Sequence, residues 1–232
     1  MGFVPMVRKF YRWLRHLIMA RSGLEPADAY VLSRSGRPVR DDRALAIPLP
    51  NLTGSLLPVL RQFINGYGWG KTCLLVSESR QVQSELALLY PDVSFKVTDY
   101  FPDLMQGGAD ILWDVCETPP PSLRKASFDS ILCQALLEHV IAPTQAIQHC
   151  LELLVPGGHL YIMTHTPSFH YHGYPKDYVR FHTDYFEDLP GYMARSAGLT
   201  VELVELYAKG GAVYACYERV DHPSPALNPP YN

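Results

Sequence analysis

Short apolar runs alternate with helical patterns from residue 71 onward, and this alternation is the feature that most constrains the fold. Runs of strand length are separated by segments whose apolar residues recur every three to four positions. Such an order is typical of parallel βαβ units whose helices cover both faces of a sheet. The strand-like runs lie at 73–76, 94–97, 111–115, 128–133 and 160–163, and the helical patterns lie at 81–89 and 144–154.

The C-terminal part follows a different pattern. Residues 199–208 and 212–220 are both strand-like, and Lys209, Gly210 and Gly211 between them indicate a hairpin. The length of 232 residues fits one domain, since domains average about 150 residues. We therefore predict an α/β fold with a doubly wound, mostly parallel seven-stranded sheet that is closed by an antiparallel C-terminal hairpin.

The N-terminal part is predicted to be an extension of this domain. Residues 3–18 combine apolar side chains at helical spacing with basic ones, which predicts a basic amphipathic helix. It is either a lid on the domain, a contact for a membrane surface or acidic partner, or a transit peptide. Residues 22–52 are proline-rich and indicate a connector, and a second helix is expected from about residue 53 to Gly66. The predicted segments are 1–50 for the helix and connector, 51–221 for the main domain, and 222–232 for a disordered tail.

Composition restricts the function classes. Twenty Lys and Arg against 23 Asp and Glu give a net charge of -3, so no global positive field attracts nucleic acid. The five cysteines contain no CxxC pair, which predicts buried thiols in a reducing compartment. No apolar run reaches the about 18 residues that a membrane span needs. We expect a cytoplasmic protein without a nucleic-acid partner.

Several local patterns point to a ligand-binding crevice. Asp99 and Asp114 each follow a strand-like run, and carboxylates at the C-terminal ends of parallel strands point into the crevice of open α/β sheets. Residues 128–140, FDSILCQALLEHV, form a buried run followed by a loop, and 154–160, LVPGGHL, contain a turn. These patterns, spread over residues 70–220, resemble the class I S-adenosylmethionine-dependent methyltransferases.

The resemblance assigns roles to individual residues. It implies S-adenosylmethionine as the cofactor, with Asp99 holding the ribose hydroxyls, Asp114 facing the adenine amine, and Gln134 in the same cofactor-binding crevice. The residues themselves leave an alternative open, because both aspartates lie beside turn-forming residues and could shape turns instead. We expect Gly157 and Gly158 to form the C-cap of the helix before them.

One motif departs from the family pattern. The family's first strand ends in an acidic residue followed by a glycine-rich turn, whereas here Leu75 stands at the acidic position and Ser77, Ser79 and Gln81 replace glycines. Side chains at these positions restrict the backbone. We predict that Ser77, Glu78 and Ser79 contact the cofactor as polar substitutes, with Glu78 near its ammonium group. Alternatively, Glu78 is a solvated carboxylate at the start of the next helix.

Residues 164–182 gather histidines and aromatic residues directly after the last predicted parallel strand. Their HxxPxDYxRF pattern at 172–181 resembles a subgroup of these methyltransferases associated with small-molecule or glycan modification. Imidazoles can act as general bases near neutral pH, and aromatic rings can shape a pocket. The predicted catalytic residues are His139, His170 and His172, and the predicted substrate-binding residues are His165, Tyr171, Tyr174, Tyr178 and Arg180.

Two alternatives apply to the same segment. An ion pair between Asp177 and Arg180 could simply hold the loop, with His139 a satisfied structural histidine. A metal ion could instead bind His170 and His172 together with His165 or Asp177. Since no strongly spaced metal signature is present, we assign no metal ligands from the sequence.

The resulting expectation is methyl transfer from S-adenosylmethionine to oxygen or nitrogen of a small molecule. Two alternatives remain open at this point. The loss of the glycines suggests a catalytically silent partner or regulatory protein with the same fold, and the histidine cluster suggests a metal-dependent enzyme that has reused the fold.

Overall fold

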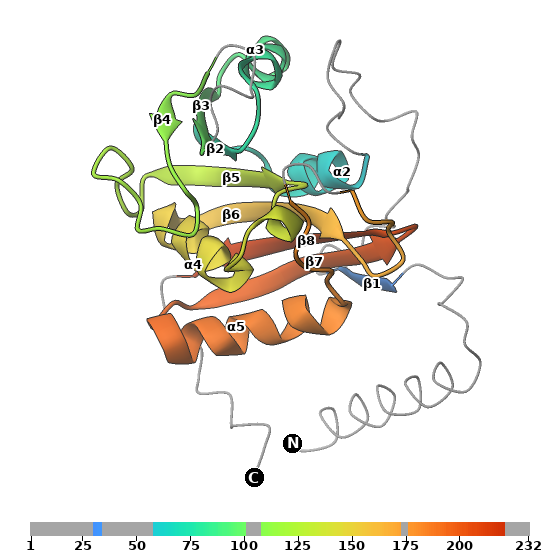
Figure 1. Cartoon of the computed structure of the whole chain (residues 1–232). Coiled ribbons are helices and arrows are strands. Elements are labelled where there is room, and N and C mark those ends of the chain that lie inside the picture. Colours follow the sequence, from blue (N-terminus) through green and yellow to red (C-terminus); the bar gives the residue numbers. More distant parts are fainter. Residues whose placement is uncertain (1–29, 34–57, 101–107, 173–175, 221–232) are drawn as a thin grey trace, which may run out of the picture. The chain divides into compact units, whose positions relative to one another are not determined.

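The structure is a computed structural model that describes residues 30–33, 58–100, 108–172 and 176–220 (Figure 1). The predicted N-terminal amphipathic helix, most of the connector and the predicted C-terminal tail lie outside these residues. Within them, no helix combines the length and apolar character needed to cross a membrane.

The described residues form one eight-stranded sheet in the order β1-β7-β8-β6-β5-β2-β3-β4. Strands β4, β3, β2, β5 and β6 are parallel, and β8 and β7 add an antiparallel hairpin beside β6. The predicted seven-stranded sheet with its closing hairpin is thus confirmed, and β1 is an additional strand within the predicted connector. The strands are β1 (Tyr30–Ser33), β2 (Thr72–Val76), β3 (Ser94–Asp99), β4 (Ile111–Leu112), β5 (Phe128–Gln134), β6 (Leu154–His165), β7 (Val201–Lys209) and β8 (Ala212–Arg219).

Helices lie on both faces of the sheet. The Tyr161 hydroxyl on β6 donates to the carbonyl of Gly68, just after α2, whereas the Tyr217 hydroxyl on β8 donates to the carbonyl of Phe186 in α5. Tyr217 pairs with Leu160, the neighbour of Tyr161, and successive side chains of a strand point to opposite faces, so α2 and α5 cover opposite faces. The helices are α2 (Pro58–Tyr67), α3 (Arg80–Leu89), α4 (Pro143–Leu153) and α5 (Thr183–Ala197), with a 3₁₀ turn, η3 (Leu137–His139).

The central strands have segments that are buried on both faces, which explains the apolar character of these segments. Residues 73–76 of β2 and 131–133 of β5 have at most 2% of their surface exposed. Four cysteines belong to this core or to α4 and are buried, and burial raises the pKa of Cys73 and Cys150 to about 12. These thiols therefore stay protonated and serve as packing groups.

The glycine pair at 157–158 does not cap a helix, so the C-cap prediction was wrong. Helix α4 ends at Leu153, and Leu154 already has extended dihedral angles and begins β6. Gly157 has a φ of 77°, and a Cβ on Gly158 would lie 2.8 Å from the Val155 carbonyl oxygen. The two glycines instead bend the start of β6 where its register with β5 shifts.

Candidate functional site

The candidate site lies at the C-terminal ends of the parallel strands, where open α/β sheets bind ligands. Asp99 and Gln134 are the last residues of β3 and β5, and Ser77 follows β2 directly. The 3₁₀ turn η3 follows β5, and the histidine-rich loop follows β6. The topology therefore brings most of the predicted site residues to one edge of the sheet.

The turn after β2 keeps a backbone conformation that favours glycine although its residue is serine. Ser77 has a φ of 60°, in the left-handed region, and its amide donates to the Thr98 carbonyl at 2.7 Å. Ser79 is buried and caps α3, because its Oγ accepts a hydrogen bond from the Val82 amide at 3.2 Å. The loss of the glycines has therefore not removed the turn or the helix N-terminus that follows it.

Two carboxylates meet beside this turn. Asp99 is 5% exposed at the end of β3. Burial, and then the negative charge of Asp99, raise the pKa of the half-buried Glu78 to about 8. Glu78 is therefore mostly protonated at neutral pH, and a cation that entered this crevice would favour its ionisation. The alternative of a fully solvated Glu78 does not agree with this environment.

Asp114 and Gln134 have different surroundings. The Asp114 carboxylate accepts the Cys116 amide at 2.9 Å, and its carbonyl accepts the Glu117 amide, so Asp114 shapes the turn after β4. Gln134 is half-buried, and its Oε1 is buried with no hydrogen-bond partner among the described residues. A buried acceptor of this kind calls for a partner. Gln134 is therefore suited to receive a ligand's donor group, whereas Asp114 already has a structural role.

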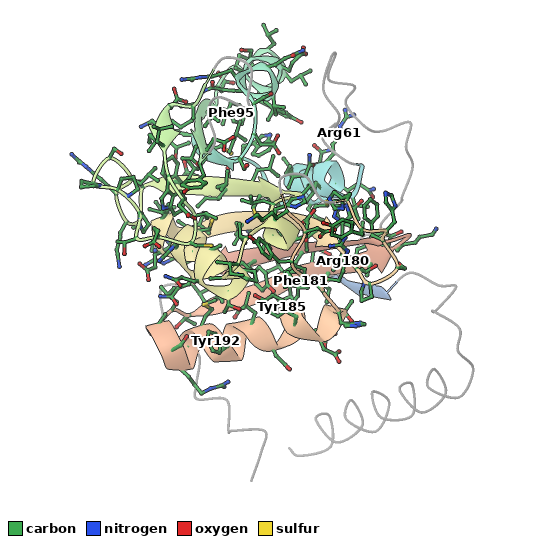
Figure 2. The ribbon with its side chains drawn as sticks, viewed as in Figure 1. Arg61, Phe95, Arg180, Phe181, Tyr185 and Tyr192 are labelled. Atoms are coloured by element: carbon green, nitrogen blue, oxygen red, sulfur yellow. The ribbon has the colours of Figure 1, made fainter. Side chains whose placement is uncertain are left out.

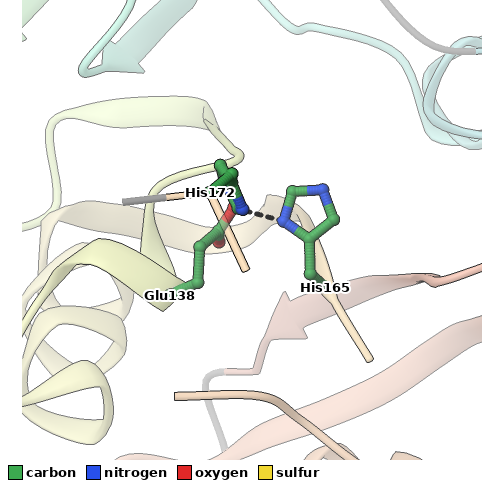
Figure 3. Close-up of side chains that lie close together, drawn as sticks. All are labelled: Glu138, His165 and His172. Carbon is green, nitrogen blue, oxygen red and sulfur yellow. Dashed lines mark hydrogen bonds and ion pairs between the residues drawn. The ribbon is translucent and has the colours of Figure 1, made fainter. Parts of the chain in front are cut away.

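A fully buried carboxylate stands at the centre of the histidine cluster (Figure 3). Glu138 in η3 has no exposed surface, and its Oε1 accepts the Nδ1 proton of His165 at 2.5 Å. Its Oε2 accepts the Thr164 hydroxyl at 2.6 Å. The Nε2 atoms of His139 and His172 lie 3.8 and 3.9 Å from Oε1. Three imidazoles thus converge on one carboxylate oxygen.

The Glu138 carboxylate is held in its charged form. Burial acts to raise its pKa, but the hydrogen bonds from His165 and Thr164 outweigh burial and lower the pKa below its usual value. Because an ionised carboxylate only accepts hydrogen bonds, Nδ1 of His165 is the donor and its Nε2 is left as the acceptor nitrogen.

The loop after β6, which carries Arg180 (Figure 2), is braced by the predicted ion pair between Asp177 and Arg180. Arg180 donates through two nitrogens to the Asp177 carboxylate and also to the His170 carbonyl at 3.1 Å. The hydrogen bond from Arg180, with weaker help from the His172 amide and charge, lowers the pKa of Asp177 despite burial. Asp177 in turn lies 3.4 Å from Nδ1 of His172. The pair both supports the loop and orients a histidine of the cluster.

An open pocket of about 280 Å³ adjoins the cluster and is lined by Phe169, Tyr171, Asp177, Tyr178, Val179 and Arg180. The ring of Phe169 stacks on that of His165 with centroids 3.8 Å apart, which connects the pocket to the cluster. Tyr171 and Tyr178 are 74% and 45% exposed. Of the predicted substrate-binding residues, Tyr171, Tyr178 and Arg180 lie together here, His165 belongs to the cluster, and Tyr174 lies outside the described residues.

The predicted catalytic histidines are not all equivalent. His139 and His172 face each other edge to face, with ring centroids 4.8 Å apart, beside Glu138. His170 is exposed and stacks on Phe169 instead. Sequence reasoning did not assign a role to Glu138, although a Glu-His pair in the loop after a buried strand was a visible signal. This carboxylate is the residue that joins the histidines.

The strand order is that of an open, mostly parallel α/β sheet, and such sheets bind ligands at the C-terminal edge of their strands. The sequence model of the methyltransferase domain family matches residues 53–201 of this chain. The chain therefore belongs to this family.

Individual relatives agree with this assignment over different lengths. The chain is 50% identical over 41 residues to the ubiquinone biosynthesis O-methyltransferase of Xanthomonas oryzae, a match that spans 18% of this chain and 17% of the relative. The solved S-adenosylmethionine-dependent methyltransferase of Archaeoglobus fulgidus is 17% identical, with 69% of this chain and 90% of that chain covered and a TM-score of 0.50. A putative methyltransferase in complex with the Haloferax volcanii Trm112 activator is 15% identical, with coverages of 67% and 85% and a TM-score of 0.50. These two structures show similarity of fold.

Proposed function

We propose that this chain transfers a methyl group from S-adenosylmethionine to a hydroxyl oxygen of a small-molecule acceptor. The observation that carries the proposal is the cluster of Glu138 with His165, His172 and His139 beside an aromatic pocket. Transfer to oxygen is favoured over nitrogen because a hydroxyl must lose its proton, and the cluster contains imidazoles that accept protons. The curated relatives that match over 41 residues are also O-methyltransferases.

The crevice residues fit the cofactor. Ser77 keeps the left-handed turn, Gln134 presents a buried acceptor without a partner, and Glu78 and Asp99 make the crevice acidic. S-adenosylmethionine supplies a methyl group on a sulfonium centre and carries an ammonium group, and both cations suit acidic surroundings. We assign the ribose hydroxyls to Asp99 and the ammonium group to Glu78, with Ser77 and Ser79 beside them.

The protein's part of the reaction follows from the cluster. Glu138 orients His165 through Nδ1, which leaves Nε2 to accept the proton of the acceptor hydroxyl. The pocket beside the stacked ring of Phe169 holds the acceptor, and Tyr171 and Tyr178 form its aromatic wall. A flat hydroxylated ring suits such a wall.

A pair of near-isosteric probes tests the reaction. The full-length protein is incubated with S-adenosylmethionine and either catechol or 1,2-diaminobenzene, and methylated products are measured by mass spectrometry. We expect a methyl ether from catechol and little product from the diamine. His165→Ala should lower turnover of catechol by about 100-fold or more with cofactor affinity retained, since general bases contribute that much. The matched control is His182→Ala, at the exposed N-cap of α5.

Two results would contradict the proposal. Equal turnover of the His165→Ala variant would remove His165 as the proton acceptor. Absence of S-adenosylmethionine binding at millimolar concentration in calorimetry would support the catalytically silent alternative.

A further inference from the structure

Glu138 and the histidines beside it also have the composition of a metal centre. We propose that Glu138, His165 and His172 bind one divalent transition-metal ion, of the Zn²⁺ type, at the edge of the aromatic pocket (Figure 3). The proposal that an ion binds here rests only on the geometry of these three side chains. The consequence for methyl transfer rests on the proposed function: a bound ion would polarise the acceptor hydroxyl and would replace His165 as the group that promotes its deprotonation.

The ligand atoms are close enough for one ion. One nitrogen or oxygen atom from each residue lies within 4.8 Å of the others. The Nε2 of His172 is 3.9 Å from Oε1 of Glu138, and Nδ1 of His165 is 2.5 Å from the same oxygen. Tetrahedral ligands about 2.0–2.1 Å from zinc are separated by roughly 3.4 Å. Shifts of about 1 Å, with the His165 proton moved from Nδ1 to Nε2 so that the imidazole stays neutral, place the ion among the three atoms.

Charge favours an ion at this place. Glu138 is completely buried, and within the described part of the chain its ion-pair partners within 4.0 Å are all histidines. The nearby guanidinium of Arg180 is engaged by Asp177. A buried carboxylate needs a paired charge or a metal ion. Two imidazoles and one carboxylate suit zinc or iron better than magnesium or calcium, which prefer oxygen ligands.

The groups behind the ligands have the arrangement found around bound metals. Metal-binding histidines usually present their second ring nitrogen to a carboxylate or carbonyl, which fixes the ring. Nδ1 of His172 lies 3.4 Å from Asp177, whose position is set by Arg180. The Thr164 hydroxyl donates to the second oxygen of Glu138 and so fixes the carboxylate. Three protein ligands leave a position open toward a substrate, as in catalytic zinc sites.

Binding of Co²⁺ and Zn²⁺ to the untagged, chelator-treated full-length protein tests the proposal. We expect one ion per chain, with visible Co²⁺ absorption typical of nitrogen ligands and displacement of Co²⁺ by Zn²⁺. His172→Ala should weaken Zn²⁺ binding by about 100-fold or more, and Asp177→Asn by about 10- to 100-fold. The control His182→Ala removes an exposed histidine outside the cluster and should leave Zn²⁺ binding unchanged.

The outcomes separate the metal centre from the proposed function. Absence of binding at millimolar Co²⁺, or equal affinity of the parent and the folded His172→Ala variant, would overturn the metal centre, and catechol methylation would be unaffected. Binding of one ion by a protein that methylates no hydroxyl would support the centre and contradict the proposed function. A circular dichroism spectrum establishes folding of each variant, and Glu138→Gln provides a second ligand change of nearly equal volume.

Discussion

The turn after β2 and the loop after β6 lie at the same edge of the sheet but are constructed in opposite ways. The turn depends on its backbone: Ser77 keeps a left-handed φ of 60° and Ser79 caps α3, although the glycines of the family are absent. The loop depends on side chains, because its histidines are organised by Glu138 from a different segment. The difference predicts that the backbone-determined turn tolerates changes of residue type better than the loop, whose organisation depends on particular side chains.

The two regions also differ in the charge that they bury. Beside the turn, Glu78 and Asp99 are like charges, and Glu78 responds by holding a proton. In the loop, Glu138 faces imidazoles and stays ionised. The turn is therefore prepared to receive a cationic ligand, whereas the carboxylate of the loop cluster already accepts hydrogen bonds from His165 and Thr164.

The largest expected effect tests the dependence of the loop on one side chain. Glu138→Ala leaves His165 and Thr164 without their buried acceptor, and each of these two hydrogen bonds to a charged group is worth about 1.5–3 kcal/mol. Urea unfolding should show this loss, with a smaller loss for Glu138→Gln. Glu117→Ala, at an exposed position, is the control and should change stability by about 0.5 kcal/mol or less. A cost below about 1 kcal/mol for Glu138→Ala would contradict the description of the cluster as a paired charge.

The sequence predicted the sheet well because its central strands are continuous apolar runs. The runs at 73–76 and 128–133 correspond to β2 and β5, and burial on both faces keeps residues 73–76 and 131–133 apolar. Helix α5 was not predicted, because Pro190 inside it argues against a helix although Phe186, Leu189 and Met193 form its buried stripe. Local periodicity thus predicts an element where burial dictates residue type and fails where tertiary packing outweighs propensity.

The candidate site was only partly accessible from the sequence. Asp99 and Gln134 end β3 and β5, and strand ends determine such positions, whereas their contacts with a cofactor stay predictions. The central role of Glu138 was missed because its contacts to Thr164 and His165 cross 26 and 27 residues of sequence. No local pattern encodes such a contact. The left-handed backbone of Ser77 was likewise hidden, because serine does not mark a positive φ as glycine does.

The second prediction tests cofactor binding at the edge of β3. Asp99→Ala should remove a charge-assisted hydrogen bond to the ribose, worth about 1.5–3 kcal/mol, and weaken S-adenosylmethionine binding by about 10-fold or more. Calorimetry measures the dissociation constant, and thermal unfolding establishes that the variant is folded. Asp92→Ala removes an exposed aspartate just before β3 and is the matched control. An unchanged dissociation constant in folded Asp99→Ala would contradict the assignment.

The third prediction restores the family's residue at the turn. Ser77→Gly should stabilise the protein by about 1 kcal/mol, because glycine adopts a φ of 60° without a Cβ penalty. Ala126 has a φ of 51° in an exposed loop, so Ala126→Gly should give a similar gain in urea unfolding. Only Ser77→Gly should also alter the affinity for S-adenosylmethionine. An equal change in affinity in both variants would show that the turn has no special contact with the cofactor.

The smallest expected effect is a pH dependence that arises from Glu78. Its pKa is about 8 in the folded protein and 4.5 in the reference state, so the folded state holds a proton that the unfolded state releases between these values. Folded stability should therefore fall as pH rises from about 5 to 8. Glu78→Gln cannot ionise, so it should match the parent at pH 4 and exceed it at pH 8, by about 1 kcal/mol or less because the group is only half-buried.

Thermal unfolding at several pH values measures this difference, which corresponds to roughly 2–4 °C for a chain of this size. Glu85→Gln makes the same substitution within α3, which follows Glu78, and should leave the pH profile unchanged. S-adenosylmethionine, a cation, should lower the pKa of Glu78 on binding and release a proton at pH 7, which calorimetry in buffers of different ionisation enthalpy detects. Proton uptake on binding would show that the turn does not respond to a cation. A pH profile of Glu78→Gln identical to that of the parent would show that Glu78 does not hold a proton in the folded protein. Either result would contradict the contrast drawn between the turn and the loop cluster.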